Sequence, residues 1–135
     1  MIAAVDTSVV LDVFGSGARF WQASAQALRR CLNDGAVVAC AAVWSETRVA
    51  FTVDAAFQRA MLALGVAFSA SQQAAATLAG ELFKRYRAAG GQRGRMVADF
   101  LIGAHAATLC DRLLSRDRSY ARKHFPGLAV LDPSA

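Results

Sequence analysis

The first fourteen residues constrain the fold more than any other segment of the chain. Residues 2–5 form an apolar run that is too short for a helix and that stops at Asp6. Such an uninterrupted run is typical of a strand buried on both faces, as in a parallel sheet. Thr7 and Ser8 follow, and their hydroxyl groups can cap a helix over residues 9–14. The segment therefore predicts a buried strand that delivers a carboxylate to its end.

Short apolar runs recur along the chain, between segments of helical periodicity. After the first strand, runs at residues 36–40, 66–68, 113–114 and 128–131 alternate with helical patterns that include residues 21–34, 42–51, 54–64 and 96–110. This order predicts an α/β fold with a mostly parallel central sheet of four to five strands.

The overall composition predicts a single domain over residues 1–135. The chain is 56% hydrophobic and 19% charged, which excludes disorder and allows a sizeable core. Its longest uncharged apolar run, residues 36–44, is far shorter than a membrane span, and the start lacks the basic segment of a secretory signal. Three scattered cysteines without metal-ligand spacing fit a reducing compartment. We expect a cytoplasmic protein without membrane contact.

The net charge is +5, and thirteen of the fifteen basic residues are arginine. The planar guanidinium group favours phosphate and carboxylate partners, so the charge is compatible with a nucleic acid without identifying one.

Four of the ten acidic residues occupy comparable places in the predicted fold. Asp6 ends the first strand, Glu46 lies early in the helix after the second strand, Asp99 lies in the first turn of a largely apolar helix, and Asp117 follows a later strand. In a parallel sheet, the carboxyl ends of strands and the amino ends of the following helices share one edge. These four side chains can therefore converge in one crevice.

Converging carboxylates repel one another unless a cation lies between them. Clustered hard oxygen donors suit Mg²⁺ or Mn²⁺, and such ions activate water for attack on a phosphodiester. We expect Glu46 and Asp99 to lie in apolar neighbourhoods, where an uncompensated carboxylate is costly. Thr7 and Ser8 are candidates to bond to the acids or to a metal-bound water. Each acid taken alone is equally compatible with a helix cap, a turn or a solvated helix position.

A Ser-His-Asp triad is a poor alternative for this chain. His105 lies six positions after Asp99, which places it about 240° further round the helix.

Several motifs, in this order, resemble the PIN-domain proteins and in particular the VapC-type toxin ribonucleases of type II toxin–antitoxin systems. The motifs are Val5-Asp-Thr-Ser8, Trp44-Ser-Glu46, Ala98-Asp-Phe-Leu-Ile-Gly-Ala-His-Ala106, Leu114-Ser-Arg-Asp117, Tyr120 and Phe125-Pro-Gly127. The resemblance implies a three-layer α/β/α fold, one or two Mg²⁺ or Mn²⁺ ions, and endonucleolytic cutting of RNA. It also implies pairing with a second copy and with a VapB-like antitoxin.

Carried over to this sequence, the resemblance implies that Asp6, Glu46, Asp99 and Asp117 are the catalytic and metal-binding residues. Ser8 would be the small polar helper, at a position where many members have asparagine.

Our first hypothesis is therefore a metal-dependent endoribonuclease in which Arg93, Arg95 or Arg116 contacts flanking phosphates. A non-catalytic RNA-binding PIN module would use the basic face without cutting. A small-molecule phosphohydrolase or phosphoacceptor domain would use Asp6, although no Asp-x-Asp motif accompanies it.

The sequence also has more apolar helical side chains than one sheet is expected to cover, which predicts an interface. The residues behind this prediction are Trp21, Phe51, Phe57, Met61 and Phe83.

Overall fold

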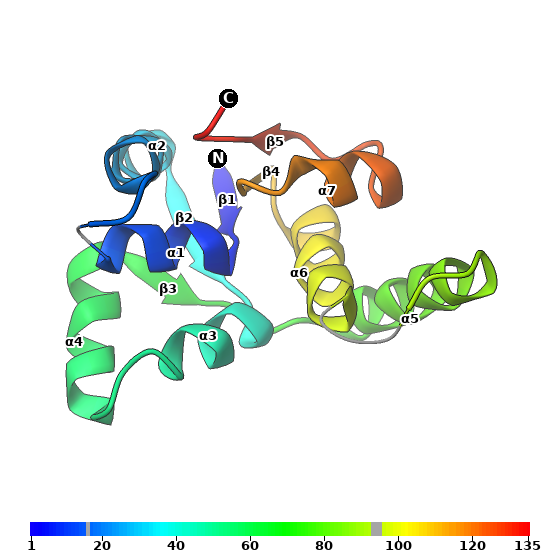
Figure 1. Cartoon of the computed structure of the whole chain (residues 1–135), viewed down its shortest axis with the longest axis horizontal. Coiled ribbons are helices and arrows are strands. Elements are labelled where there is room, and N and C mark those ends of the chain that lie inside the picture. The colour runs from blue at the N-terminus through cyan, green and yellow to red at the C-terminus, as the bar shows by residue number, and fades with distance from the viewer. Residues whose placement is uncertain (16, 93–95) are drawn as a thin grey trace.

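The computed structural model describes residues 1–15, 17–92 and 96–135. Within these residues the chain forms five strands and seven helices (Figure 1). The strands are β1 (Ile2–Val5), β2 (Ala36–Ala39), β3 (Val66–Phe68), β4 (Arg112–Leu114) and β5 (Val130–Leu131). The helices are α1 (Thr7–Phe14), α2 (Trp21–Asp34), α3 (Ala41–Arg48), α4 (Asp54–Leu64), α5 (Gln73–Ala88), α6 (Met96–Leu109) and α7 (Arg118–His124). No helix among the described residues is long and apolar enough to cross a membrane.

The five strands form one sheet in the order β3-β2-β1-β4-β5, and every neighbouring pair is parallel. The predicted α/β fold with a mostly parallel sheet is therefore confirmed, and the sheet is parallel throughout. β1 is the central strand of this order, and three of its four residues, Ala3, Ala4 and Val5, are buried. A strand covered on both faces needs apolar side chains at consecutive positions, which is the pattern of this segment.

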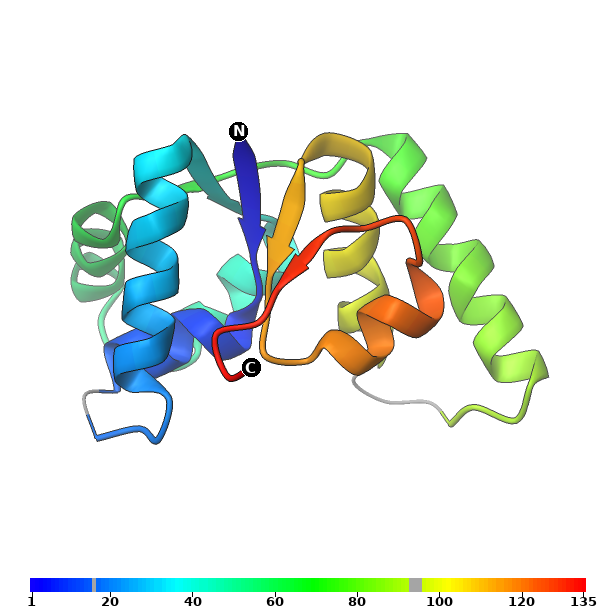
Figure 2. The ribbon, with the colours of Figure 1, turned by 90° about the horizontal axis from the view of Figure 1, so that it is seen from above.

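Helices cover both faces of the sheet. The chain moves from β1 to β2 and β3 in one direction and then returns to β4 and β5 on the other side of β1. Because crossovers are right-handed, the two directions put their helices on opposite faces. Figures 1 and 2 both show α1, α2 and α4 to one side of β1 and α5, α6 and α7 to the other. The three-layer arrangement expected for the chain is confirmed.

The apolar helix predicted over residues 96–110 is confirmed as α6, which packs on β1 and β4. Phe100, Ile102 and Ala104 are buried on it. Its outer side is covered by α5, whose Phe83 and Tyr86 contact the ring of Phe100. This double contact explains why α6 is apolar nearly all round.

Several predicted element boundaries were wrong by a few residues. α1 begins at Thr7 rather than at residue 9, because Asp6 is its N-cap and accepts a hydrogen bond from the Thr7 backbone N at 2.7 Å. α3 ends at Arg48 rather than at Phe51, and the Arg48 guanidinium donates to the Phe51 carbonyl oxygen. β5 begins at Val130, because Leu128 is part of a turn in which its backbone N donates to the Phe125 carbonyl oxygen.

Two of the five residues behind the predicted apolar interface, Phe57 and Met61, are buried and so cannot contribute to it. Phe57 and Met61 are each only 1% exposed and belong to the core. Exposed apolar side chains lie elsewhere: Val49, the C-cap residue of α3, is 84% exposed, and Leu62 on α4 is 83% exposed. Helical periodicity identifies an apolar stripe but does not identify which stripe the sheet covers.

We expect Gly103→Ala to destabilise the protein, because a Cβ atom at Gly103 would overlap the buried ring of Phe125. Overpacking of this kind costs about 1–3 kcal/mol. Gly80→Ala is the matched control, since nothing lies within 4 Å of a Cβ atom at that exposed position of α5. It should stabilise the protein by roughly 0.5–1 kcal/mol. Urea denaturation measures both values, and equal effects of the two substitutions would contradict the packing described for α6.

Candidate active site

The candidate site lies at the carboxyl end of β1, between β2, to which the chain passes from β1, and β4, to which it returns from β3. Ligands of open α/β sheets bind at such a switch point. Asp6 follows β1 directly, and its backbone N donates to the Leu114 carbonyl oxygen at 2.9 Å. This bond joins the end of β1 to the end of β4. The sheet therefore brings the Asp6 segment beside the segment that carries Asp117.

The hydroxyl group of Ser115 links these two acids. It donates to Asp6 Oδ2 at 2.6 Å and accepts a hydrogen bond from the Asp117 backbone N at 3.0 Å. Ser115 itself is fully buried. Sequence reasoning missed this residue, although one signal was present: a small polar side chain directly after a buried strand and two positions before a candidate acid.

The carboxyl group of Asp6 is only 6% exposed. Burial raises its pKa, the hydrogen bonds from Ser115 and the Thr7 backbone act in the opposite direction, and the negative charges of Glu46 and Asp117 raise it further. Glu46 and Asp117 are therefore both within electrostatic range of the Asp6 carboxyl group. A nearby cation would favour the ionised form of this buried carboxyl group and so oppose the rise in its pKa.

Glu46 reaches the site through Thr7, whose Oγ1 donates to Glu46 Oε1 at 2.7 Å. The prediction that Glu46 lies in an apolar environment was wrong, because the residue is exposed. Its helix, α3, buries the side that carries Val43 and Thr47 and leaves Glu46 on the open side. An exposed carboxylate at a crevice costs little on its own and remains available to a ligand.

Asp99 lies in the first turn of α6 and is partly buried. It shares an electrostatic neighbour with two of the other acids: Tyr120, a buried residue of α7. Burial raises the pKa of Tyr120, and the negative charges of Asp6, Asp99 and Asp117 raise it further. The Tyr120 hydroxyl group is therefore within electrostatic range of three acids that lie far apart in the sequence.

The donor groups fit a hard divalent cation in kind. The four acids supply carboxylate oxygens, and two buried hydroxyl groups, Ser8 Oγ and Tyr120 OH, have no hydrogen-bond partner among the described residues. As the side chains stand, the described residues contain no group of three or more His, Cys, Asp or Glu placed to hold a single ion.

Arg116 was expected to contact RNA phosphate, and in the structure it is bound to Asp12. Its Nε donates to Asp12 Oδ2 at 2.6 Å and its Nη2 donates to Asp12 Oδ1 at 3.1 Å. Asp12 had no predicted role. Arg93 and Arg95, the other two predicted phosphate contacts, lie outside the described residues.

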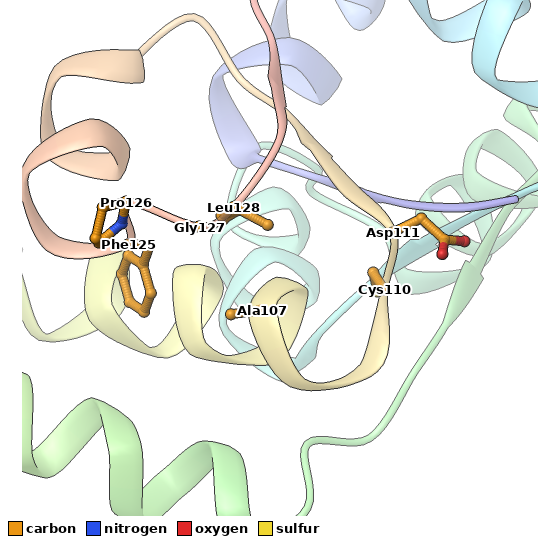
Figure 3. A pocket seen from close by; sticks show the side chains of 7 residues that line it. All are labelled: Ala107, Cys110, Asp111, Phe125, Pro126, Gly127 and Leu128. Atoms are coloured by element: carbon orange, nitrogen blue, oxygen red, sulfur yellow. The ribbon is translucent and has the colours of Figure 1, made fainter.

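A separate hollow of about 300 Å³ lies at the opposite edge of the sheet, where α6 leads into β4 (Figure 3). Asp111 at its rim accepts a hydrogen bond from the Ile2 backbone N at 2.6 Å, which holds the start of β1. Burial, and then the charge of Asp111, raises the pKa of the Cys110 thiol to about 11. This thiol is protonated and weakly nucleophilic near neutral pH.

We expect Asp6→Asn to remove a pH-dependent cost of folding. Since the pKa of Asp6 is raised in the folded chain, its contribution to the free energy of unfolding is full below the unfolded pKa. That contribution is lost as pH rises through the folded pKa, whereas asparagine does not titrate. The free energy of unfolding of the wild type minus that of the variant should therefore decrease as pH rises above about 4, the range of the unfolded pKa.

Chemical denaturation without divalent ions measures this difference, and Asp54→Asn, at a side chain 67% exposed on α4, is the matched control. A difference that grows with pH would contradict the burial of the Asp6 charge.

The chain was compared with protein-family models and with solved structures. The PIN domain model matches residues 3–126. VapBC2 from Rickettsia felis, solved bound to a promoter DNA fragment, is similar with a TM-score of 0.74 at 15% identity, covering 98% of each chain. VapBC-1 from nontypeable Haemophilus influenzae has a TM-score of 0.72 at 14% identity over 100% of both chains.

A toxin–antitoxin complex from Klebsiella pneumoniae has a TM-score of 0.65 at 22% identity over 97% of each chain. No curated protein matches the sequence. The solved structures establish a shared fold at these identities, and the family is established by the domain model. Since that model covers nearly the whole sequence, the chain belongs to the PIN domain family.

Proposed function

We propose that this protein is a metal-dependent endoribonuclease of the VapC type, the toxin of a toxin–antitoxin pair. The observation that carries the proposal is the buried Asp6 at the switch point of the sheet, joined to the Asp117 segment by Ser115. Glu46 and Asp99 add two further carboxylates on the elements around it. Membership of the PIN domain family supports a nuclease.

Asp6, Glu46, Asp99 and Asp117 would hold one or two Mg²⁺ or Mn²⁺ ions, with Ser8 as a polar neighbour. When bound, such an ion makes water more acidic and neutralises charge at the phosphodiester. The protein supplies the orientation: Ser115 fixes Asp6 from one side, and the Thr7 hydroxyl group directs Glu46. The ion would also stabilise the ionised form of Asp6, which burial disfavours.

The proposed substrate is RNA, and a basic surface supports this choice. The last turns of α5 and α7 carry Arg85, Arg87, Arg122 and Lys123. Arg85, Tyr86 and Lys123 line a hollow of about 340 Å³ between these helix ends. Cations beside an aromatic ring suit a single-stranded backbone and its bases.

The proposed partners are a second copy of the chain and a small VapB-like antitoxin, in the cytoplasm. The solved structures similar to this chain include VapBC proteins and a toxin–antitoxin complex. The chain itself exposes apolar side chains at Val49, Val53 and Leu62, as an interface requires. A basic side chain of the antitoxin, placed near the acids, would compete with the metal ion for them.

The proposed function predicts a specific loss of RNA cleavage. Asp6→Asn, Glu46→Gln, Asp99→Asn and Asp117→Asn should each lower the cleavage rate by about 100-fold or more, the scale lost with one catalytic group. The exposed Asp54→Asn should retain wild-type cleavage. The measurement is cleavage of a labelled single-stranded RNA with Mg²⁺ or Mn²⁺, with circular dichroism to verify folding.

Wild-type activity in two of the four acid variants would contradict the metal site. RNA binding without cleavage by the wild type would instead favour a non-catalytic RNA-binding module. Release of phosphate from small esters, with RNA left intact, would favour a phosphohydrolase.

The proposed partners predict an apolar interface that includes α4. The wild type should run as a dimer in light scattering, and co-expression with the adjacent reading frame should give a complex that cleaves RNA slowly. Leu62→Glu should weaken at least one of these associations, because it puts a charge on a side chain that is 83% exposed. Glu81→Gln, a change at an exposed position of α5, is the control. A monomer that is harmless when expressed alone would contradict both partners.

A further inference from the structure

Arg116 is next to Asp117 of the proposed metal site in the sequence, yet its guanidinium group binds elsewhere. It lies between Ser115 and Asp117, and the Ser115 hydroxyl group contacts both Asp6 and the Asp117 backbone. The Arg116 side chain is instead paired through two nitrogens with Asp12, at 2.6 and 3.1 Å. Asp12 is on α1, more than one turn beyond Asp6.

The surroundings of this pair fix it from several sides. Asp12 is 6% exposed, and its Oδ2 also accepts a hydrogen bond from the Ser24 hydroxyl group of α2 at 2.7 Å. The guanidinium carbon of Arg116 lies 4.6 Å from the centre of the Phe20 ring. A bidentate carboxylate and an aromatic face are the two partners that a guanidinium group binds most specifically.

The pairing matters because a guanidinium group is itself a strong ligand of carboxylates. Among the described residues, neither Asp6 nor Asp117 has a cationic partner, and Asp6 accepts hydrogen bonds from the Ser115 hydroxyl group and the Thr7 backbone N instead. An unrestrained Arg116 side chain, one residue away from Asp117, would pair with these acids. It would then oppose a divalent ion both by occupying the oxygens and by its positive charge.

We propose that Asp12 is an internal counterion that holds Arg116 away from the carboxylates and so keeps them open to a divalent cation. This inference rests on the proposed function, since it concerns the same acids. Asp12 and Arg116 are positioning residues here, and they act through the geometry and charge of the site. A purely structural ion pair would make the two residues matter only for stability.

A double-substitution cycle separates these two roles. Mn²⁺ affinity is measured by isothermal titration calorimetry and by the Mn²⁺-dependent rise in melting temperature, for the wild type, Asp12→Asn, Arg116→Gln and the double variant. We expect Asp12→Asn to bind Mn²⁺ roughly 5-fold or more weakly, the usual scale of coupling between two sites. Arg116→Gln should bind at least as tightly as the wild type, and the double variant should match Arg116→Gln.

Phe20→Leu provides a second route that leaves every carboxylate in place. This substitution removes the aromatic ring that contacts the Arg116 guanidinium group. It should weaken Mn²⁺ binding, as Asp12→Asn does, and adding Arg116→Gln should restore the affinity. This variant tests the inference even where Asp12→Asn does not fold. Melting temperatures without metal report the structural effect of each change separately.

Two results would overturn the inference. One is wild-type Mn²⁺ affinity in folded Asp12→Asn. The other is a double variant, or a Phe20→Leu/Arg116→Gln variant, that binds as weakly as its parent, which would make the pair structural only. A wild type that binds no divalent ion would overturn the proposed function as well, so the two failures are distinguishable.

Discussion

The hydrogen bond from Ser115 Oγ to Asp6 Oδ2 is the interaction on which the candidate site depends. It spans 109 sequence positions at 2.6 Å and joins the ends of the two central strands. The parallel pairing of β1 with β4 brings these ends together, and the hydroxyl group then orients the carboxylate. Because Ser115 also accepts from the Asp117 backbone, one small side chain sets the position of two acids. The fold and the site are therefore coupled at one buried hydroxyl group.

Burial of Asp6 makes the ionised form of its carboxyl group unfavourable in the folded chain. Burial raises the pKa of this carboxyl group, and the charges of Glu46 and Asp117 raise it further. Structural carboxylates usually acquire a basic partner. Here the arginines on either side of Asp117, Arg116 and Arg118, are paired with Asp12 and Asp132 instead, so Asp6 and Asp117 have no cationic partner among the described residues. The arrangement opposes the stability of the isolated chain and favours binding of a cation, which is a common property of functional sites.

The sheet was predictable from the sequence because it depends on local patterns. The apolar runs at β1, β2 and β4 and the apolar helix α6 each lie close to their predicted bounds. The placement of Asp6 and Asp117 at strand ends followed from those runs. The alternation of short apolar runs with helical segments then required parallel strands, whose carboxyl ends share an edge.

The remaining features could not be predicted because they depend on pairings between distant side chains. The bond of Arg116 with Asp12 spans 104 positions, and the sequence does not indicate which acidic residue pairs with this arginine. The exposure of Glu46 depends on which side of α3 faces the sheet, and Val43 and Thr47 settle it only in the folded chain. Phe57 was expected at an interface because the sequence does not show which side of α4 faces the core. In the structure it is buried beside Trp44.

The acidic edge as a metal centre is the central claim, and a direct measurement is available. Crystals of the wild-type protein grown with Mn²⁺ would be examined for anomalous scattering at the manganese absorption edge. The account predicts a peak bounded by the carboxylates of Asp6, Asp99 and Asp117, with Arg116 still paired with Asp12. Full occupancy of manganese elsewhere, with these carboxylates free of metal, would contradict it.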